Sequence, residues 1–102
     1  MAVRNRYLEG MVLSLLSRMA QGSYSYEIRK LLGQVSLISE ATIYGICGRL
    51  EKQRNIRADS AVHIVDGRIR KYYRITEAGI TALKKIKKEY QREREQLDHW
   101  LG

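Results

Sequence analysis

An Asp-Gly pair, Asp66-Gly67, divides a segment that is rich in β-branched and aromatic residues, 61–75. A type I′ turn needs positive φ at both of its central positions, and Asp followed by Gly meets this requirement. The pair therefore predicts a tight antiparallel hairpin in which Ile64 lies opposite Ile69.

Alternation along the two expected strands gives the hairpin one apolar and one basic face. The apolar face consists of Val62, Ile64, Ile69, Tyr73 and Ile75. The other face consists of His63, Val65, Arg68, Arg70, Tyr72 and Arg74. We expect the apolar face to pack on the helices of the domain. Because Lys71 falls on this face, either its amine extends to solvent or the register shifts by one residue.

Two helical patterns come first in the chain. Apolar residues recur at intervals of three and four over 7–19, which predicts an amphipathic helix. After a turn at 21–23, a shorter stripe predicts a second helix with Ser23 as its N-cap. This stripe consists of Tyr24, Ile28, Leu31 and Val35. We expect residues 33–36 to form the turn that follows it.

A third helix is expected over about 40–54, with Ser39 as its N-cap and Asn55 at its end. Its apolar stripe consists of Ile43, Ile46, Cys47 and Leu50, and its opposite face of Ala41, Gly45, Gly48 and Lys52. Each interior glycine costs a helix about 1 kcal/mol relative to alanine. The small face is therefore either drift tolerated in a loosely wound helix, or a smooth ridge on which a DNA groove or another helix lies closely.

A long helix is expected over 77–100, with Thr76 as its N-cap. Positions spaced alternately by four and three form a heptad seam along it: Gly79, Leu83, Ile86, Tyr90, Glu93, Leu97 and Trp100. We expect the apolar members of this seam, from Leu83 to Trp100, to bury against a second copy of the chain in a two-fold dimer. The alternative is that the helix folds back on the first helix of its own chain.

The order of these elements indicates the fold. Helix, short helix, turn and helix are typical of a helix-turn-helix, and a basic hairpin after them makes a winged helix. We expect a mostly helical α+β fold. Residues 1–75 form its winged helix-turn-helix, DNA-binding domain with a two-stranded wing, and residues 76–102 its long dimerisation helix.

Charge and composition bound the function. The net charge is +8, and residues 1–75 carry almost all of it, with 13 Lys and Arg against 6 Asp and Glu. A basic globular chain favours a polyanionic partner, nucleic acid above all; the alternative is a generally basic, solvated surface. The single cysteine excludes an intramolecular disulfide and fits a reducing cytoplasm. We identify no signal peptide and no apolar segment long enough to span a membrane.

Motifs for catalysis or metal binding are not found in the sequence. His63 and His99 lie far apart, and Cys47 lies on an apolar stripe, where a free cysteine behaves as a small hydrophobe. No His, Cys and Asp spacing matches a metal site, and no glycine-rich loop follows a strand. We therefore expect no enzyme activity, no metal and no cofactor.

Three motifs stand in order along the chain: Ser39-Glu40-Ala41-Thr42-Ile43-Tyr44, Arg49-Leu50-Glu51-Lys52 and Arg70-Lys71-Tyr72-Tyr73-Arg74-Ile75-Thr76-Glu77-x-Gly79. With them, nearly the whole chain resembles the PadR family of transcriptional regulators. The resemblance implies a winged helix with a C-terminal dimerisation helix, which is single and long in the short members. It also implies DNA as the partner, and a repressor as the commonest function.

Side chains with donors and acceptors that reach base edges read a DNA sequence, whereas cations and helix N-termini bind its phosphates. On these grounds the candidates for base readout are Thr42, Tyr44 and Arg49. Ser39 and Tyr24, near helix N-termini, are candidates for phosphate contacts, and Arg68 and Arg70 in the wing for contacts to phosphate or the minor groove. The chain departs from the family at Gly45, where proline is usual, and at Gly48, where Lys or Arg is common. The loss of that cation removes a phosphate contact and leaves a smooth face. Because few side chains on this face reach base edges, we expect modest sequence discrimination and an affinity that depends largely on backbone charge.

Some short members of the family bind flat, apolar compounds between the C-terminal helices of the dimer. By resemblance, Tyr90 falls near an aromatic position that stacks on such a ligand, and Trp100 lies three turns further on. Both residues are open to two interpretations, a small aromatic ligand or plain interface core. The function is open in a similar way. The alternative to a regulator is a winged-helix protein-interaction module with weak or non-specific DNA binding.

Overall fold

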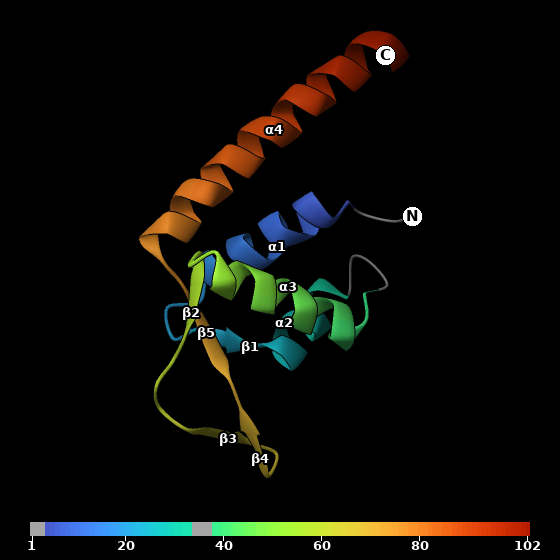
Figure 1. The fold of residues 1–102 in the computed structure, drawn as a ribbon. Coiled ribbons are helices and arrows are strands. Elements are labelled where there is room, and N and C mark those ends of the chain that lie inside the picture. The colour runs from blue at the N-terminus through green and yellow to red at the C-terminus, as the bar shows by residue number, and fades with distance from the viewer. Residues whose placement is uncertain (1–3, 34–37) are drawn as a thin grey trace.

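A computed structural model of the chain describes residues 4–33 and 38–102. Its elements are α1 (Asn5–Ser17), β1 (Ser23–Tyr24), α2 (Ser25–Leu32), α3 (Glu40–Lys52), β2 (Ile56–Ala58), β3 (His63–Val65), β4 (Arg68–Arg70), β5 (Tyr72–Ile75) and α4 (Glu77–Leu101). The predicted winged helix with a long C-terminal helix is confirmed (Figure 1). Val35 and most of the turn expected at 33–36 lie outside the described residues.

The sheet is larger than the sequence predicted. β5 is the central strand of a three-stranded antiparallel sheet of order β1-β5-β2, and β3 and β4 form a separate hairpin. Strands β1 and β2 have only two and three residues, which is too short for alternation to identify them. The hairpin turn is as predicted, because Asp66 has φ 53° and Gly67 has φ 75°, and Ile64 pairs with Ile69.

The hairpin formed by β3 and β4, which we call the wing, turns its predicted apolar face outward. Val62, Ile64 and Ile69 have exposed fractions of 72%, 69% and 78%, so the expectation that they pack on the helices is wrong. The reason is a break at Lys71, after which β5 pairs with β1 and β2. The Lys71 amine donates to Glu51 at 2.8 Å, and only beyond this break do apolar side chains turn into the core.

Two helix caps are confirmed, and two predicted boundaries are corrected. The Ser39 hydroxyl accepts the backbone N–H of Thr42, and the Thr76 hydroxyl accepts that of Gly79. Helix α3 ends at Lys52 instead of Arg54, and Arg54, not Asn55, leaves the helix with a left-handed φ of 62°. Ser23 does not cap α2, because it lies in β1 and Tyr24 occupies the N-cap position.

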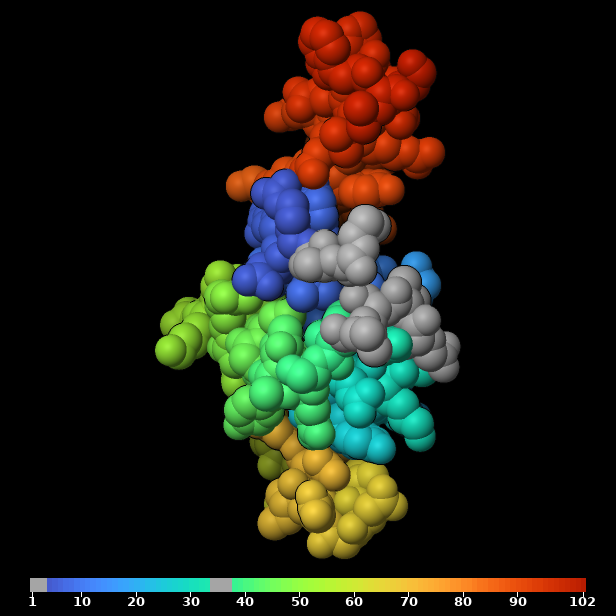
Figure 2. All heavy atoms as spheres, turned by 90° about the vertical axis from the view of Figure 1, so that its right-hand side faces the viewer, coloured from blue at the N-terminus to red at the C-terminus, as the bar shows by residue number. Residues whose placement is uncertain are grey.

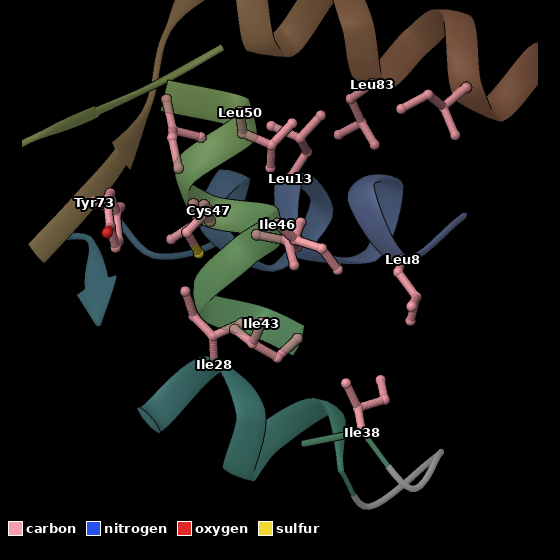
Figure 3. Close-up of a cluster of buried hydrophobic side chains, with 14 residues drawn as sticks. Leu8, Leu13, Ile28, Ile38, Ile43, Ile46, Cys47, Leu50, Tyr73 and Leu83 are labelled. Atoms are coloured by element: carbon pink, nitrogen blue, oxygen red, sulfur yellow. The ribbon is translucent and has the colours of Figure 1, made fainter. Parts of the chain in front are cut away.

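The core lies between α1, α2 and α3 and is closed by β5 and the first turns of α4 (Figure 3). All four residues of the predicted α3 stripe are buried: Ile43, Ile46, Cys47 and Leu50. They meet Leu13 from α1 and Ile28 from α2. Burial raises the pKa of the Cys47 thiol to about 12, so this cysteine acts as a core residue.

Helix α4 divides into a packed half and a protruding half (Figures 1 and 2). Its first half packs on α1, where a Cβ atom at Gly10 would lie 2.8 Å from Ile86 Cγ2. Leu83 and Ile86 are therefore buried in their own chain, which corrects the expectation that they face a second copy. Beyond them the helix extends past the body, and Leu97 and Trp100 have exposed fractions of 51% and 81%.

Candidate nucleic-acid interface

The outer surface of α3 is open to solvent along its length. Thr42 and Arg49 are seven residues apart and so lie on the same flank, while Tyr44, with an exposed fraction of 61%, lies on the other. Between the flanks, a Cβ atom added to Gly45 or Gly48 would meet nothing within 4 Å. No contact within the described residues therefore explains the two glycines.

The N-terminal end of α3 is a polar site. The Ser39 hydroxyl lies 2.8 Å from the Thr42 hydroxyl and accepts the Thr42 backbone N–H at 3.1 Å. Both side chains are exposed, and the first turn of a helix offers further N–H groups to an anion. This end can therefore hold a phosphate oxygen beside the two hydroxyls.

Arg49 pairs on its protein side with a carboxylate of α1. Its Nε lies 2.9 Å from Oε1 of Glu9, and its side chain is 47% exposed. Glu9 is almost buried, with an exposed fraction of 8%. The other oxygen of this carboxylate faces Arg6 at 3.5 Å, so Glu9 lies between two guanidinium groups. Arg49 is consequently both a surface cation and part of an ion-pair network.

The wing is attached to the body through its basic face. The guanidinium of Arg70 lies 5.7 Å from the ring centroids of both Tyr24 and Tyr26, and its Nη1 is 3.8 Å from Glu40 at the start of α3. His63, which pairs with Arg70 across the wing, stacks on Tyr72 with 4.1 Å between the ring centroids. Arg70 is thus mostly covered, whereas Arg68 beside the turn is exposed.

Asp59 fixes the base of the wing. Its carboxylate accepts the backbone N–H of Ala61 at 3.1 Å and lies 3.0 Å from His63 Nε2 and 3.6 Å from Arg74. The Ala61 N–H, followed by His63, lowers the pKa of Asp59. These contacts set the direction in which the wing leaves the sheet.

Tyr24 is not a free surface group. It occupies the N-cap position of α2 without a side-chain cap, and its ring lies 5.2 Å from that of Tyr72. Burial, and then the charge of Glu27, raises the pKa of Tyr24. Its position under Arg70 suits it to supporting the wing.

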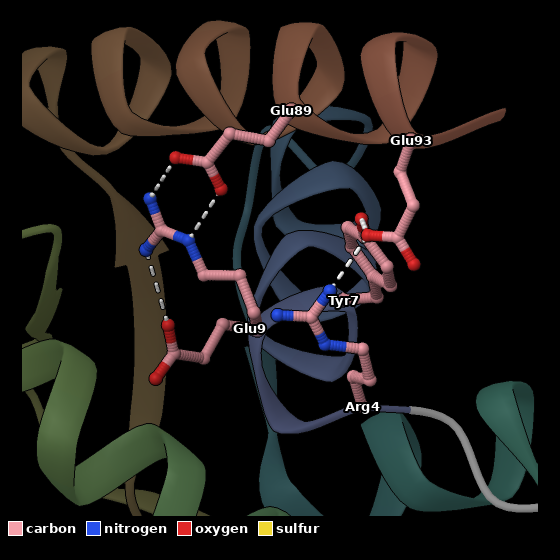
Figure 4. A network of polar contacts seen from close by, with 6 residues as sticks. Arg4, Tyr7, Glu9, Glu89 and Glu93 are labelled. Carbon is pink, nitrogen blue, oxygen red and sulfur yellow. Dashed lines mark hydrogen bonds and ion pairs between the residues drawn. The ribbon is translucent and has the colours of Figure 1, made fainter. Parts of the chain in front are cut away.

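Two seam residues of α4, Tyr90 and Glu93, contact α1, and Figure 4 shows Glu93 beside Tyr7 and Arg4. The ring of Tyr90 packs edge-to-face on Tyr7 at 5.7 Å. Glu93 accepts the Tyr7 hydroxyl and pairs with Arg4 at 2.6 Å, and it raises the pKa of Tyr7. Beside these residues lies an apolar hollow of about 360 Å³, lined by Tyr7, Gly10, Met11, Ser14, Leu83, Ile86, Lys87 and Tyr90. Tyr90 therefore lines a cavity, whereas Trp100 extends beyond it.

The network around Glu9 was not predicted from the sequence, although one signal for it exists. Glu9 precedes Leu16 by seven residues and so lies on the apolar side of α1. A carboxylate in such a place must be paired with a cation or a hydrogen-bond donor. The partners, Arg6 and Arg49, could not be predicted in this way, because Arg49 comes from another helix.

The described part of the chain has neither a metal-binding cluster nor a membrane-spanning helix. In residues 4–33 and 38–102, no group of three or more His, Cys, Asp and Glu side chains could hold a metal ion. Over the same ranges, every helix is too short or too polar to cross a membrane.

Known proteins are similar to this chain over nearly its whole length. A family model described as the transcriptional regulator PadR-like family matches residues 12–85. A relative from Lysinibacillus sphaericus, named uncharacterized protein X, is 34% identical over 105 residues, which cover 97% of this chain and 95% of the relative.

Solved structures share the architecture as well as the sequence pattern. The protein smu.1704 from Streptococcus mutans UA159 is 28% identical with a TM-score of 0.82, over 96% of this chain and 89% of that chain. A PadR family transcription regulator from Clostridium difficile R20291 is 27% identical with a TM-score of 0.79, over 94% of this chain and 99% of that chain. The similarity includes most of the long C-terminal helix, since it covers 96% and 94% of this chain.

Proposed function

We propose that this chain, which belongs to the PadR-like family of transcriptional regulators, forms a dimer that binds double-stranded DNA and represses transcription. The observation that carries the proposal is the open outer surface of α3 beside an exposed wing, both in the strongly basic part of the chain. A dimer bound at a promoter blocks access to that DNA without any further domain. As a DNA-binding protein, the chain would act in the cytoplasm.

Helix α3 supplies the contacts to the major groove in this proposal. Thr42 and Tyr44, on its two flanks, reach base edges, and Arg49 contacts a phosphate. The Ser39 end holds a second phosphate. Gly45, with Gly48 one turn later, lets the helix backbone approach the groove closely. Few side chains then reach the bases, so affinity depends largely on the phosphate contacts.

The wing supplies a second contact, in the minor groove. Arg68 is exposed beside the turn and reaches phosphate, while Arg70 and Tyr24 support the wing from behind. The outward aliphatic face, with Ile64 and Ile69 at its centre, is suited to the apolar deoxyribose walls of the groove. Apolar side chains of minor-groove proteins commonly lie in the groove, where many of them insert between base steps.

The dimer contact is proposed for the protruding half of α4 and for the hollow between α1 and α4. The chain would divide into residues 1–75, which bind DNA, and residues 76–102, which bind the second copy. Tyr90, Leu97 and Trp100 remain exposed on one chain, with fractions of 49%, 51% and 81%. Large exposed apolar groups of this kind mark an interface, and a two-fold arrangement covers both sets at once.

A second candidate function, the response to a flat, apolar ligand, rests on the same hollow. Its volume of about 360 Å³ is within the range of small-molecule sites. Tyr90 lines it with an aromatic ring, and the partner's copy of α4 would bring Trp100 close. An aromatic compound that binds there would compete with the dimer contact or change its geometry.

The proposal is tested by DNA binding of two matched variants. Arg68→Ala removes the exposed cation of the wing, and Arg92→Ala removes an exposed arginine of α4 that lies off the seam. We expect Arg68→Ala to weaken binding of an operator duplex and to reduce the salt slope by about one unit, whereas Arg92→Ala leaves both unchanged. Equal binding by the two variants would remove the wing from the interface. Binding to a protein partner but to no DNA would favour the interaction-module alternative.

A further inference from the structure

Four charged side chains from three helices form one continuous chain of ion pairs. Arg6 on α1 meets Glu89 on α4 through two bonds, of 2.9 and 3.1 Å, and the same guanidinium faces Glu9 at 3.5 Å. Glu9 in turn meets Arg49 on α3 at 2.9 Å. Figure 4 shows Glu9 and Glu89 directed at one guanidinium from opposite sides.

The contact of Glu9 is with the inner end of the Arg49 guanidinium, and within residues 4–33 and 38–102 the outer end makes no hydrogen bond. Glu9 contacts Nε, the nitrogen closest to the aliphatic stem. The two Nη groups lie at the far end of the planar guanidinium, where they can bind two oxygens of one anion. Since the Arg49 side chain is 47% exposed while Glu9 is almost buried, the carboxylate acts from inside the protein and the cation points outward.

We propose that Glu9 is a positioning residue for DNA binding, which holds the Arg49 guanidinium in the orientation that contacts a backbone phosphate. This role rests on the proposed function. Without Glu9, the long side chain of Arg49 would sample several rotamers, and DNA would have to order it at a cost. Arg6 pairs with the Glu9 carboxylate and helps to hold it in place. Because Arg6 also pairs with Glu89, the arrangement is connected to α4.

The proposal predicts a change in DNA affinity opposite to the one usually expected when an acidic residue is removed. Removing an acidic residue from a DNA-binding protein normally strengthens binding, because repulsion of the phosphates falls. We expect Glu9→Ala to weaken binding instead, by about tenfold, which is the cost of ordering a free arginine. Glu9→Gln should restore part of the affinity, since its amide oxygen occupies the same place beside Arg49 Nε but without the charge. Glu95→Ala removes an exposed acid on the face of α4 opposite the seam and so spares the proposed dimer contact. It is the matched control and should bind as tightly as the wild type.

The test is a double-mutant cycle of Glu9→Ala and Arg49→Ala, measured by fluorescence anisotropy on one operator duplex over a range of salt. We expect the two single variants and the double variant to lose affinity to a similar extent, with a salt slope lower by about one unit in each. Independent losses that multiply, or a Glu9→Ala variant that binds as tightly as the wild type, would overturn the positioning role. A wild-type protein that binds no DNA would instead overturn the proposed function, and this role with it.

A measurement without DNA separates positioning from folding. In ¹⁵N relaxation measurements, the Nε–H group of Arg49 should be rigid in the wild type and in Glu9→Gln, and mobile in Glu9→Ala. The chemical shifts of the core amides show in the same spectra whether each variant is folded. A mobile Arg49 Nε–H group in the folded wild type would refute the proposal.

Discussion

Alanine at Gly45 and Gly48 should make the protein more stable. Both glycines lie inside α3, where glycine costs about 1 kcal/mol relative to alanine. The added methyl groups would meet nothing within 4 Å, so no steric penalty offsets the gain. The double variant should therefore gain about 2 kcal/mol in its free energy of unfolding. For a chain of this size, this corresponds to a rise in Tm of roughly 8–15 °C.

The gain is measured by urea and thermal unfolding followed by circular dichroism. Protein concentration must be equal throughout, because dimer formation makes Tm depend on it. Gly67→Ala is the matched control: its methyl group would also meet nothing within 4 Å, but its φ is 75°. It should lose stability by about 1 kcal/mol, because alanine is strained at positive φ. Double-alanine protein that is no more stable than the wild type would refute the reasoning that α3 is a regular helix with an open face.

The same variant decides between the two interpretations of the glycines. If they are tolerated drift, affinity for the operator should stay within twofold while stability rises. If they form a smooth ridge for the major groove, the two methyl groups would keep α3 away from the bases, and affinity should fall despite the greater stability.

Three further predictions follow from the same structure. Ile64→Ser with Ile69→Ser should change the free energy of unfolding by less than about 1 kcal/mol in urea titrations, because both side chains are exposed; a larger loss would show that they pack on the body. Native Cys47 should not react with a thiol reagent at pH 8, because burial raises its pKa to about 12; labelling followed by mass spectrometry should detect it only on unfolding. The pairing with Arg6 lowers the pKa of Glu89, so its contribution to stability is present above the unfolded pKa and is lost as pH falls through the lower, folded pKa. Acid unfolding of Glu89→Gln should therefore depend less on pH in this range; an unchanged acid limb would contradict the ion pair.

Local signals in the sequence predicted the features that one short segment decides. The cap at Ser39 and the turn at Asp66-Gly67 depend on residues within two to three positions of one another. The stripe of α3 also needs only its own spacing. For such features, interactions within the segment itself supply nearly all of the stabilising free energy.

The orientation of the wing could not be predicted in this way. Alternation assigns residues to two faces of a hairpin but does not say which face turns toward the body. Here Arg70 interacts with Tyr24, Tyr26 and Glu40, all more than 25 positions away in sequence. These contacts, together with the break at Lys71, leave the aliphatic face outside.

The seam of α4 shows a second limit. A heptad pattern indicates that an apolar stripe must be buried, but it does not identify the element that buries it. The absence of a side chain at Gly10 lets α1 cover Ile86 within the same chain, and Tyr7 reaches Tyr90 and Glu93. The second half of the stripe extends beyond α1, which leaves it for the proposed partner.

The central claim, a dimer that binds DNA sequence-specifically, is tested most directly by titration. The protein should be titrated with duplex DNA from upstream of its own gene and with an unrelated duplex of equal length, at two salt concentrations. The account predicts tighter binding to the first duplex, two protomers for each duplex, and a steep loss of affinity as salt rises. Absence of binding to either duplex at low salt, or equal binding to both, would contradict it.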